Sequence, residues 1–243
     1  MAAAVVLYAG AELVWEWRTT RLAPPVDERV SNIVALVVGE ALRLATLPLR
    51  FAVFSALATF APFTLPSAWW TLLACYVLVD LLLYVLHRLM HETRIGWACH
   101  SVHHTSGAFE LSLGGRVNWV QRLVDDFFYL PLVLLGFSPA LVLFALELNR
   151  SSQYWTHTKM LGRLGIIDFW LNTPSNHRVH HYAVEGGPRR NYGSNFMVWD
   201  HLFGTYQREG GPHPFGTDFG PLGSNPLRIQ FEGFRRFVTG RLS

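Results

Sequence analysis

Residues 87–104 of the chain read HRLMHETRIGWACHSVHH, a stretch with five histidines that directly follows a long apolar run. On a helix, side chains three and four residues apart share a face, so the spacing predicts two rows of imidazoles, His87 with His91 and His100 with His103 and His104. A second H-x-x-H-H pattern occupies 177–181, and His157 stands alone between the two. Nine of the eleven histidines fall in these groups, which favours a metal site over chance placement. Imidazole suits zinc, copper, iron and nickel, so the spacing predicts a transition metal without choosing it.

The composition indicates an integral membrane protein. Of the 243 residues, 51% are hydrophobic and only 15% are charged, and the mean hydropathy is positive, which is unusual for a soluble globular domain. The net charge of +3 comes almost wholly from arginine, since Lys159 is the only lysine. No basic run is interleaved with a nucleic-acid motif, so the arginines favour a membrane surface and no nucleic acid is expected. Cys75 and Cys99 give no disulfide framework, which fits a reducing compartment.

The apolar segments predict an all-α fold, a multi-pass membrane helix bundle with a cytosolic histidine-rich cap. Residues 68–86 supply about the 20 residues that cross a hydrocarbon core. Residues 31–60 are apolar but interrupted, and 1–17 read as a short membrane helix before a polar loop over 18–30. Glycine and proline at 136–139 predict a helical hairpin that dips into the membrane and returns. From about residue 161 onward the chain is soluble in character.

Several ionisable or polar residues on these helices are predicted to share a helical face. Asp80, Tyr84, His87 and His91 share one helical stripe, so Asp80 is expected to orient a histidine; pairing with Arg43 or Arg50 is the alternative. Asn149, Gln153 and His157 are spaced by four and are expected on one face.

Two further expectations come from the basic residues. The three histidine groups can form one site only on one side of the membrane, which is also the side of Arg18, Arg21 and Arg29, so the positive-inside rule places the site in the cytoplasm. At the C-terminus, an apolar helical stripe lies opposite a row of arginines, with Leu227, Phe231, Phe234 and Val238 against Arg228, Arg235 and Arg236. This pattern predicts an interfacial helix or a plain surface helix.

The ordered motifs resemble those of the fatty acid hydroxylase and sterol desaturase superfamily of integral membrane oxygenases. They are H-x-x-x-H, H-x-x-H-H, the lone histidine in QYWTH, NTPSNHRVHH, and NYGSNFMVWDHLFGT. From about residue 80 to 206 the chain is most similar to the alkylglycerol monooxygenase branch and its bacterial relatives. The matching domain division is 1–66 for N-terminal membrane helices, 67–206 for the catalytic domain and 207–243 for a cytosolic tail.

The resemblance implies two metal ions, iron in the active enzyme and zinc in some preparations, held by His87, His91, His100, His103, His104, His157, His177, His180 and His181. It also implies use of molecular oxygen and two electrons to hydroxylate or desaturate a C–H bond of a lipid. Gln153 stands where some relatives have a further histidine, which leaves a coordination position open to water or oxygen. His201 stands where relatives often have arginine and is left out of the ligand set, and Asn191 and Asp200 are expected to be structural.

Rival functions differ in their ligand pattern. No second histidine completes H-E-x-x-H after His91-Glu92, and no paired Glu-x-x-His motifs exist, which disfavours a zinc protease and a carboxylate di-iron bundle. A non-catalytic or transport-related membrane protein with a zinc pair is the alternative. No G-x-G-x-x-G or haem signature is present, so electrons are expected from a separate partner protein or a diffusible reductant. The sequence leaves open the lipid, the choice between hydroxylation and desaturation, and the membrane, which would be the inner membrane in a bacterium or the endoplasmic reticulum in a eukaryote.

Overall fold

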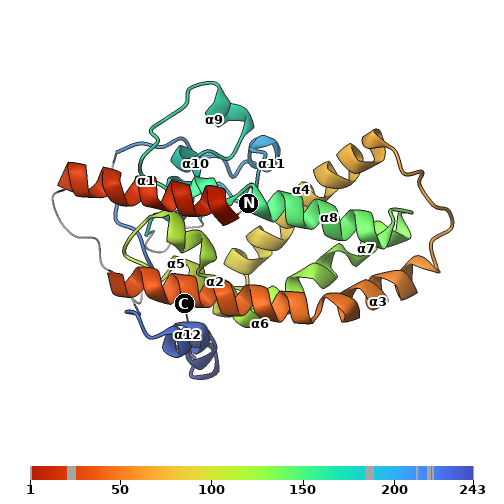
Figure 1. The fold of residues 1–243 in the computed structure, drawn as a ribbon, viewed down its shortest axis with the longest axis horizontal. Coiled ribbons are helices and arrows are strands. Elements are labelled where there is room, and N and C mark those ends of the chain that lie inside the picture. The colour runs from red at the N-terminus through yellow and green to blue at the C-terminus, as the bar shows by residue number, and fades with distance from the viewer. Residues whose placement is uncertain are drawn as a thin grey trace.

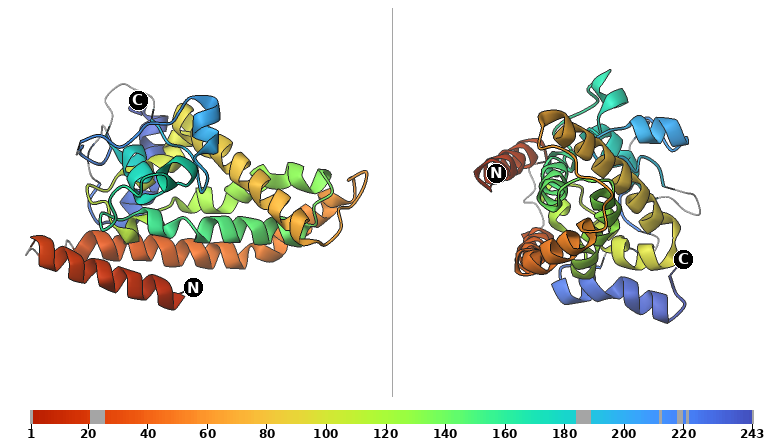
Figure 2. Two further views of the ribbon diagram at one scale, coloured as in Figure 1. Left: turned by 90° about the horizontal axis from the view of Figure 1, so that it is seen from above. Right: turned by 90° about the vertical axis from the view of Figure 1, so that its right-hand side faces the viewer.

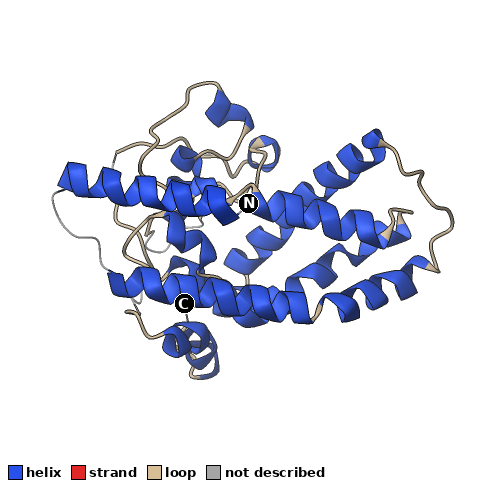
Figure 3. Ribbon diagram, viewed as in Figure 1, coloured by secondary structure: helices blue, strands red, loops and turns tan. Residues whose placement is uncertain are grey.

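A computed structural model describes residues 2–20, 26–183, 189–211, 213–217, 220 and 222–242. Every regular element in these ranges is an α-helix or a 3-10 helix, and none is a strand (Figure 3). Two isolated bridges, between Leu171 and Phe196 and between Tyr182 and Phe215, are the only β-type pairings among them. The all-α prediction is confirmed.

Five helices run along the long axis of the molecule and form an apolar bundle (Figure 1, Figure 2). They are α2 (Val26–Ala45), α3 (Leu47–Ala58), α4 (Trp69–Glu92), α7 (Leu130–Leu134) and α8 (Pro139–Ser151). Helix α4 packs on α8, and α3 packs on both arms of the α7–α8 hairpin. Fully buried side chains such as Phe54, Val79, Val133 and Leu146 form the core between α3, α4, α7 and α8, while α2 packs mainly on two short helices within 111–124.

The hairpin predicted around 136–139 is present. Gly136 adopts a φ of +86°, a conformation that favours glycine, and its carbonyl accepts a hydrogen bond from Leu65 N at 2.8 Å. Ser138 then caps α8 by accepting from Leu141 N, and Pro139 occupies the first helical turn, where its missing N–H is not needed. Whether this hairpin enters a membrane stays a prediction.

Helix α4 is long and apolar enough to cross a membrane, in agreement with the span expected for 68–86. Helices α2 and α3 meet the same test only as a pair, bent by 49°. The bend coincides with Pro48 in the first turn of α3, and proline interrupts the helical hydrogen-bond ladder. By length and composition the described helices therefore supply one span, or two if the bent pair counts as one.

The polar loop expected for 18–30 is wrong in its bounds. Helix α1 (Ala2–Thr20) continues through Arg18, and α2 begins at Val26, so only 21–25, with Arg21, lie outside the described residues. Asp27 and Glu28 stand in the first turn of α2, where carboxylates interact favourably with the helix dipole. Arg29 then pairs with Glu16 of α1, which fixes the two helices to each other.

The remaining elements gather at one end of the bundle (Figure 1). They are α5 (Arg94–His104), η1 (Leu111–Gly115), α6 (Trp119–Val124), η2 (Asp125–Tyr129), η3 (Tyr154–Thr156), α9 (Ile167–Trp170), α10 (Pro174–His181), α11 (Val198–Phe203) and α12 (Pro226–Val238). Helix α12 lies across α5 and buries Ile229 and Gly233, while Leu227, Phe231 and Val238 of the predicted apolar stripe are exposed.

Candidate metal centre

A tight corner between α4 and α5 brings the first histidines together. Thr93 ends α4 and caps α5 by accepting a hydrogen bond from Gly96 N at 3.2 Å. A Cβ on Gly96 would lie 2.5 Å from Met90 Cα, so only glycine permits this approach. The corner folds α5 back on the end of α4 and places the Nε2 atoms of His87 and His100 3.1 Å apart.

The nine predicted histidines form two groups, and in each group the candidate ligand atoms all lie within 4.8 Å of one another. The five-histidine group contains His87, His91, His100, His104 and His180. The four-histidine group contains His103, His157, His177 and His181. In the second group the Nε2 atoms of His157 and His177 are 2.8 Å apart, and those of His103 and His157 are 3.1 Å apart.

Each H-x-x-H-H motif contributes to both groups. On α5, His100 and His104 enter the five-histidine group and His103 enters the other; on α10, His177 and His181 enter the four-histidine group and His180 crosses over. In each motif, the two histidines that are four residues apart therefore belong to one group. The third histidine, which is next to one of them in sequence, belongs to the other group. The groups are in contact, since the rings of His104 and His181 stack at 4.3 Å.

Hydrogen bonds on the far side of the rings orient several of these imidazoles. The Nδ1 atoms of His87 and His180 each lie 2.9 Å from a backbone carbonyl, that of Tyr192 and of Arg190. His103 Nδ1 lies 3.3 Å from the carbonyl of Arg116. A carbonyl oxygen only accepts, so each contact requires the proton on Nδ1 and leaves Nε2 with a free lone pair, the state in which imidazole binds metals.

The residues fit metal ions. Within the described part of the chain, buried ring nitrogens of His91, His104, His177 and His180 have no hydrogen-bond partner, which costs free energy unless another ligand satisfies them. Neighbouring nitrogens around an ion with bonds of about 2.0–2.1 Å lie roughly 3 Å apart at right angles. The observed separations of 2.8–3.1 Å match that geometry.

Burial keeps these histidines neutral. The seven that lie outside α4 are each at most 7% exposed. Loss of hydration lowers the pKa of His157 to about 3, and burial holds the pKa values of the other six well below their usual range, with neighbouring imidazoles adding to the effect. Neutral imidazole is the form that ligates a metal, so the site is ready to bind without releasing protons from these rings.

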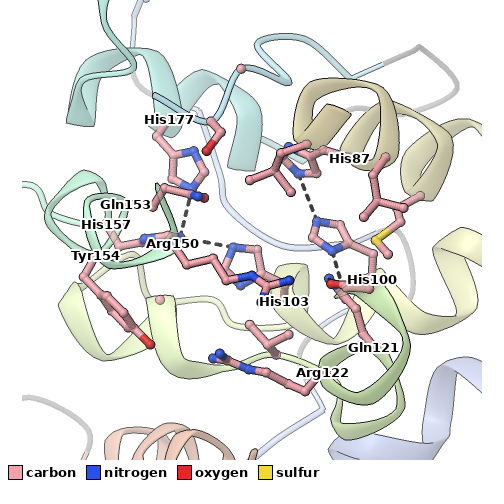
Figure 4. Close-up of a pocket in the computed structure, with 18 residues that line it drawn as sticks. His87, His100, His103, Gln121, Arg122, Arg150, Gln153, Tyr154, His157 and His177 are labelled. Atoms are coloured by element: carbon pink, nitrogen blue, oxygen red, sulfur yellow. Dashed lines mark hydrogen bonds between the residues drawn. The ribbon is translucent and has the colours of Figure 1, made fainter. Parts of the chain in front are cut away.

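A cavity of about 130 Å³ opens beside both groups (Figure 4). Histidines of both groups line one wall, and Leu83, Leu86 and Met90 of α4 line another. Arg122 and Arg150 reach in from α6 and α8 (Figure 4). The cavity therefore places an apolar wall next to side chains that can bind a metal, an arrangement that suits an apolar ligand.

Gln121 and Asp125 also line this cavity and were not predicted. Gln121 Oε1 lies 3.3 Å from His100 Nδ1, and its Nε2 donates to Asp125 at 3.1 Å. Burial raises the pKa of Asp125 to about 6. The only sequence signal is that these two polar residues stand four apart, which by itself does not indicate contact with a histidine.

The expected contact between Asp80 and a histidine is wrong. Asp80 accepts hydrogen bonds from Asn149 Nδ2, Asn195 N, Phe196 N and Trp199 Nε1. The alternative is wrong as well, because Arg50 pairs with Asp126 and Arg43 with Glu40 and Glu147. Helical spacing put Asp80 on the histidine stripe, but it faces the 195–199 segment, which sequence alone does not place there.

The other predicted residues are found as follows. Asn149 and Gln153, predicted to share a helical face, are hydrogen-bonded at 2.9 Å. Helix α8 ends at Ser151, and His157 comes after the following 3-10 helix, η3. Gln153 lines the cavity, and its role as an open coordination position stays a prediction. His201 lies outside both groups and contacts the carbonyl of Phe169.

Asn191 and Asp200 have structural contacts. Asp200 accepts from the backbone N–H groups of Tyr192 and Gly193. Asn191 has a φ of +57° and donates to the carbonyls of Asn176 and Gln207. Both therefore hold the loop that supplies the Tyr192 carbonyl behind His87.

Comparison with known proteins agrees with the motif resemblance. The chain is 35% identical over 172 residues to human alkylglycerol monooxygenase, which covers 67% of this chain and 36% of that protein. It is 37% identical over 158 residues to the Danio rerio alkylglycerol monooxygenase, covering 61% and 34%. With the ornithine lipid hydroxylase OlsE of Rhizobium tropici it is 30% identical over 191 residues, covering 78% and 57%.

The chain thus spans only about a third of the length of these alkylglycerol monooxygenases. No solved structure matches the chain. A family model described as fatty acid hydroxylase matches residues 72–205, the region that holds all nine histidines of the two groups. Because this match covers more than half of the sequence, the chain belongs to the fatty acid hydroxylase family.

Proposed function

We propose that the protein is a membrane-bound, non-haem di-iron oxygenase that hydroxylates a C–H bond of a lipid with molecular oxygen and two electrons. The observation that carries this proposal is the pair of histidine groups beside a cavity whose other wall is the apolar surface of α4. Two separate groups with five and four imidazoles support two ions rather than one. Nitrogen ligands without carboxylates suit iron, although zinc binds such sites more tightly and replaces iron in some preparations.

The nine histidines would hold the metals, and bound iron would supply the activation of oxygen and the removal of hydrogen from an unactivated carbon. The chain supplies the surroundings. Leu83, Leu86 and Met90 bind an acyl or alkyl chain and exclude water from the reacting carbon. The Tyr192 and Arg116 carbonyls hold the rings of His87 and His103 in place. Gln153, which lines the cavity, would bind water or oxygen beside the metals.

The relatives favour hydroxylation over desaturation for the reaction of this chain. Two are named as an alkylglycerol monooxygenase and one as an ornithine lipid hydroxylase. A lipid substrate fits the apolar wall of the cavity, and the electrons would come from a separate protein or a diffusible reductant.

The topology we propose is multi-pass, with the histidine groups on the cytoplasmic side. Helix α4 qualifies as a span, and α2 with α3 as a bent one; the α7–α8 hairpin would enter from the histidine side and return. Residues 1–66 would then form the N-terminal helices, 67–206 the catalytic domain and 207–243 the tail. Arg29 pairs with Glu110, which follows the histidines of α5, and a basic residue at this end supports a cytoplasmic histidine side.

The test is oxygen use by purified protein loaded with ferrous iron and supplied with a chemical reductant. With an alkylglycerol or an ornithine lipid present, oxygen uptake should rise, and the product should be one oxygen atom heavier than the substrate, with that oxygen carrying the label when labelled oxygen gas is used. His181→Ala should abolish the lipid-dependent uptake, whereas His201→Ala, outside both groups, should retain it. Label arriving from water, or uptake that no lipid stimulates, would contradict the proposal and favour a zinc-binding or transport protein.

A further inference from the structure

Two short helices, α9 before and α11 after the histidines of α10, expose a large amount of apolar surface. Eight side chains of α9 and α11 and their flanks are 38–73% exposed, and we call them the α9–α11 patch: Ile166, Ile167, Phe169, Trp170, Leu171, Val198, Leu202 and Phe203. Single exposed apolar residues are ordinary, but a contiguous group on a protein surface marks an interaction site.

The patch is one continuous surface. Met197 N donates to the carbonyl of Trp170 at 3.0 Å, and Leu171 forms an isolated bridge with Phe196. The His201 ring stacks on Phe169 at 4.2 Å. Segments 166–171 and 196–203 are therefore held edge to edge, which brings their exposed side chains into one region of the surface.

No exposed carboxylate interrupts the patch. The two acidic residues of these segments, Asp168 and Asp200, are 5% and 0% exposed. Asp168 accepts from Leu164 N and Thr173 Oγ1, so its charge is turned inward. A surface with buried acids and exposed aliphatic and aromatic side chains suits a hydrocarbon environment better than water.

The patch is fixed to α4 at the middle of that helix. Trp199 Nε1 donates to Asp80 at 2.8 Å, and the Phe203 ring stacks on Tyr84 at 5.4 Å. Asp80 is eleven residues after Trp69 and twelve before Glu92, the ends of α4. At 1.5 Å per residue it lies about 17 Å from either end, which is near the centre of a hydrocarbon core about 30 Å thick if α4 crosses it.

The backbone between the two helices is satisfied in the way that a lipid environment demands. An N–H group in hydrocarbon must be paired within the protein, since no water is available. The N–H groups of Asn195 and Phe196 donate to the Asp80 carboxylate. This contact explains why an ionisable residue stands inside the apolar α4.

From these observations we infer that the α9–α11 patch is embedded in the acyl-chain region of the bilayer, in the leaflet on the histidine side, as an in-plane insertion beside α4. The inference rests on the proposed crossing of the bilayer by α4, but not on the reaction. It replaces the expectation that the chain from residue 161 onward is wholly soluble. The helix that the patch contacts is also the candidate span, and Leu73 and Trp69, nearer the start of α4, are 55% and 78% exposed and would face lipid if α4 crosses the bilayer.

The test uses single cysteines in the full chain, with Cys75 and Cys99 replaced by alanine. Leu202→Cys and Ile166→Cys each carry an environment-sensitive fluorophore, and the protein is reconstituted into vesicles with or without brominated acyl chains. Leu73→Cys is the control within α4, and Arg208→Cys, an exposed position beyond α11, is the aqueous control. Fluorescence loss at 202 and 166 should equal that at 73 and exceed that at 208 several-fold.

The outcomes separate the inference from its premise and from the proposed function. Quenching at 73 with none at 202 and 166 would overturn the inference while leaving α4 as a span. No quenching at 73 would remove α4 from the bilayer, and the inference with it. Cross-linking of 202 to a second copy without quenching would assign the patch to a dimer instead. None of these results depends on oxygen uptake, so the proposed reaction stands or falls separately.

Discussion

Four histidines carry buried ring nitrogens that find no protein partner among the described residues: His91, His104, His177 and His180. Each buried polar atom left without a hydrogen bond costs about 1–3 kcal/mol. Such a cost has to be offset elsewhere, and these rings belong to groups in which neighbouring nitrogens are about 3 Å apart. At the scale of single residues, we therefore expect bound metal ions to contribute to the stability of the site.

Replacing one histidine from each group tests this dependence. His104→Ala should weaken metal binding in the five-histidine group and His181→Ala in the four-histidine group, so that each purified variant holds about one ion fewer after dialysis. His201→Ala, a histidine outside both groups, is the matched control and should keep the full content. Elemental analysis measures the ions, and equal metal content in all three variants would refute the assignment.

Gln121 offers a second test at this scale because it joins a histidine to a carboxylate. Gln121→Leu removes the acceptor behind His100 Nδ1 and leaves the ring free to rotate. Loss of such an outer contact lowers metal affinity by about 10- to 100-fold. Competition with a coloured chelator should show this loss, whereas Gln207→Leu, at an exposed position, should not change the affinity. Unchanged affinity in Gln121→Leu would mean that the 3.3 Å contact does not orient His100.

The nine histidines were predictable from the sequence, but their orientation was not. Motif spacing placed them on helical faces, and all nine occur in the two groups. The carbonyls behind His87 and His180 belong to Tyr192 and Arg190, which lie in a distant loop. Any residue type has a carbonyl, so the sequence carries no signal for these contacts.

At the scale of elements, the histidines of α5 depend on the helices on either side. Helix α12 packs on α5, and the approach is closest at Gly233, where a Cβ would lie 2.1 Å from the carbonyl oxygen of Ala98. That residue stands two positions before His100. The apolar stripe in the C-terminal tail predicted the helix but not the element on which it packs. Amphipathic spacing describes one helix and not the surface that covers it.

Gly233→Ala should therefore move α12 away from α5. Overpacking of this kind costs about 1–3 kcal/mol, so the midpoint of denaturant unfolding in detergent should fall. Gly162→Ala, where nothing lies within 4 Å of the added carbon, is the control and should leave the midpoint unchanged. An unchanged midpoint in both variants would show that α12 does not lie against α5 as described.

Asp80 connects two elements, and its replacement distinguishes a structural role from a catalytic one. Asp80→Ala leaves the N–H groups of Asn195 and Phe196 without an acceptor and should cost roughly 2–5 kcal/mol. Asp80→Asn retains one acceptor oxygen and should cost less. Metal content should be unchanged in both variants below their unfolding temperatures. Metal loss without loss of stability would instead revive the expected contact with a histidine.

At the scale of the whole molecule, the two histidine groups join parts of the chain that are far apart in sequence. Side chains from α4, α5, η3 and α10 meet there, and the cavity beside them also receives α6 and α8. The sequence predicted the helices of the bundle because apolar runs and proline breaks are local signals. It did not predict the ion pairs of Asp126 with Arg50 and Arg150 or the attachment of α11 to α4, which depend on contacts between different elements of the chain.

Metal-free protein should also show a pH dependence whose sign follows from the burial of the histidines. In the unfolded chain a histidine has a pKa of about 6.5, whereas burial lowers the pKa of His157 to about 3 and holds those of six others, such as His104 and His180, far below the usual value. Below the unfolded pKa the unfolded state binds more protons, so stability is present above about pH 6.5 and is lost as the pH falls.

Each such histidine lowers the free energy of unfolding by about 1.4 kcal/mol for every pH unit below the unfolded pKa. Thermal unfolding of the chelated protein in detergent, measured between about pH 5 and 8, should show a steep fall in the midpoint on the acidic side. Protein reloaded with metal should resist acid to a lower pH, because protons must then displace the ions. His201→Ala should follow the same curve as the unsubstituted chain, since His201 belongs to neither group. A midpoint in chelated protein that does not change across this range would show that the histidines are accessible to protons, and the dry, neutral site described above would be wrong.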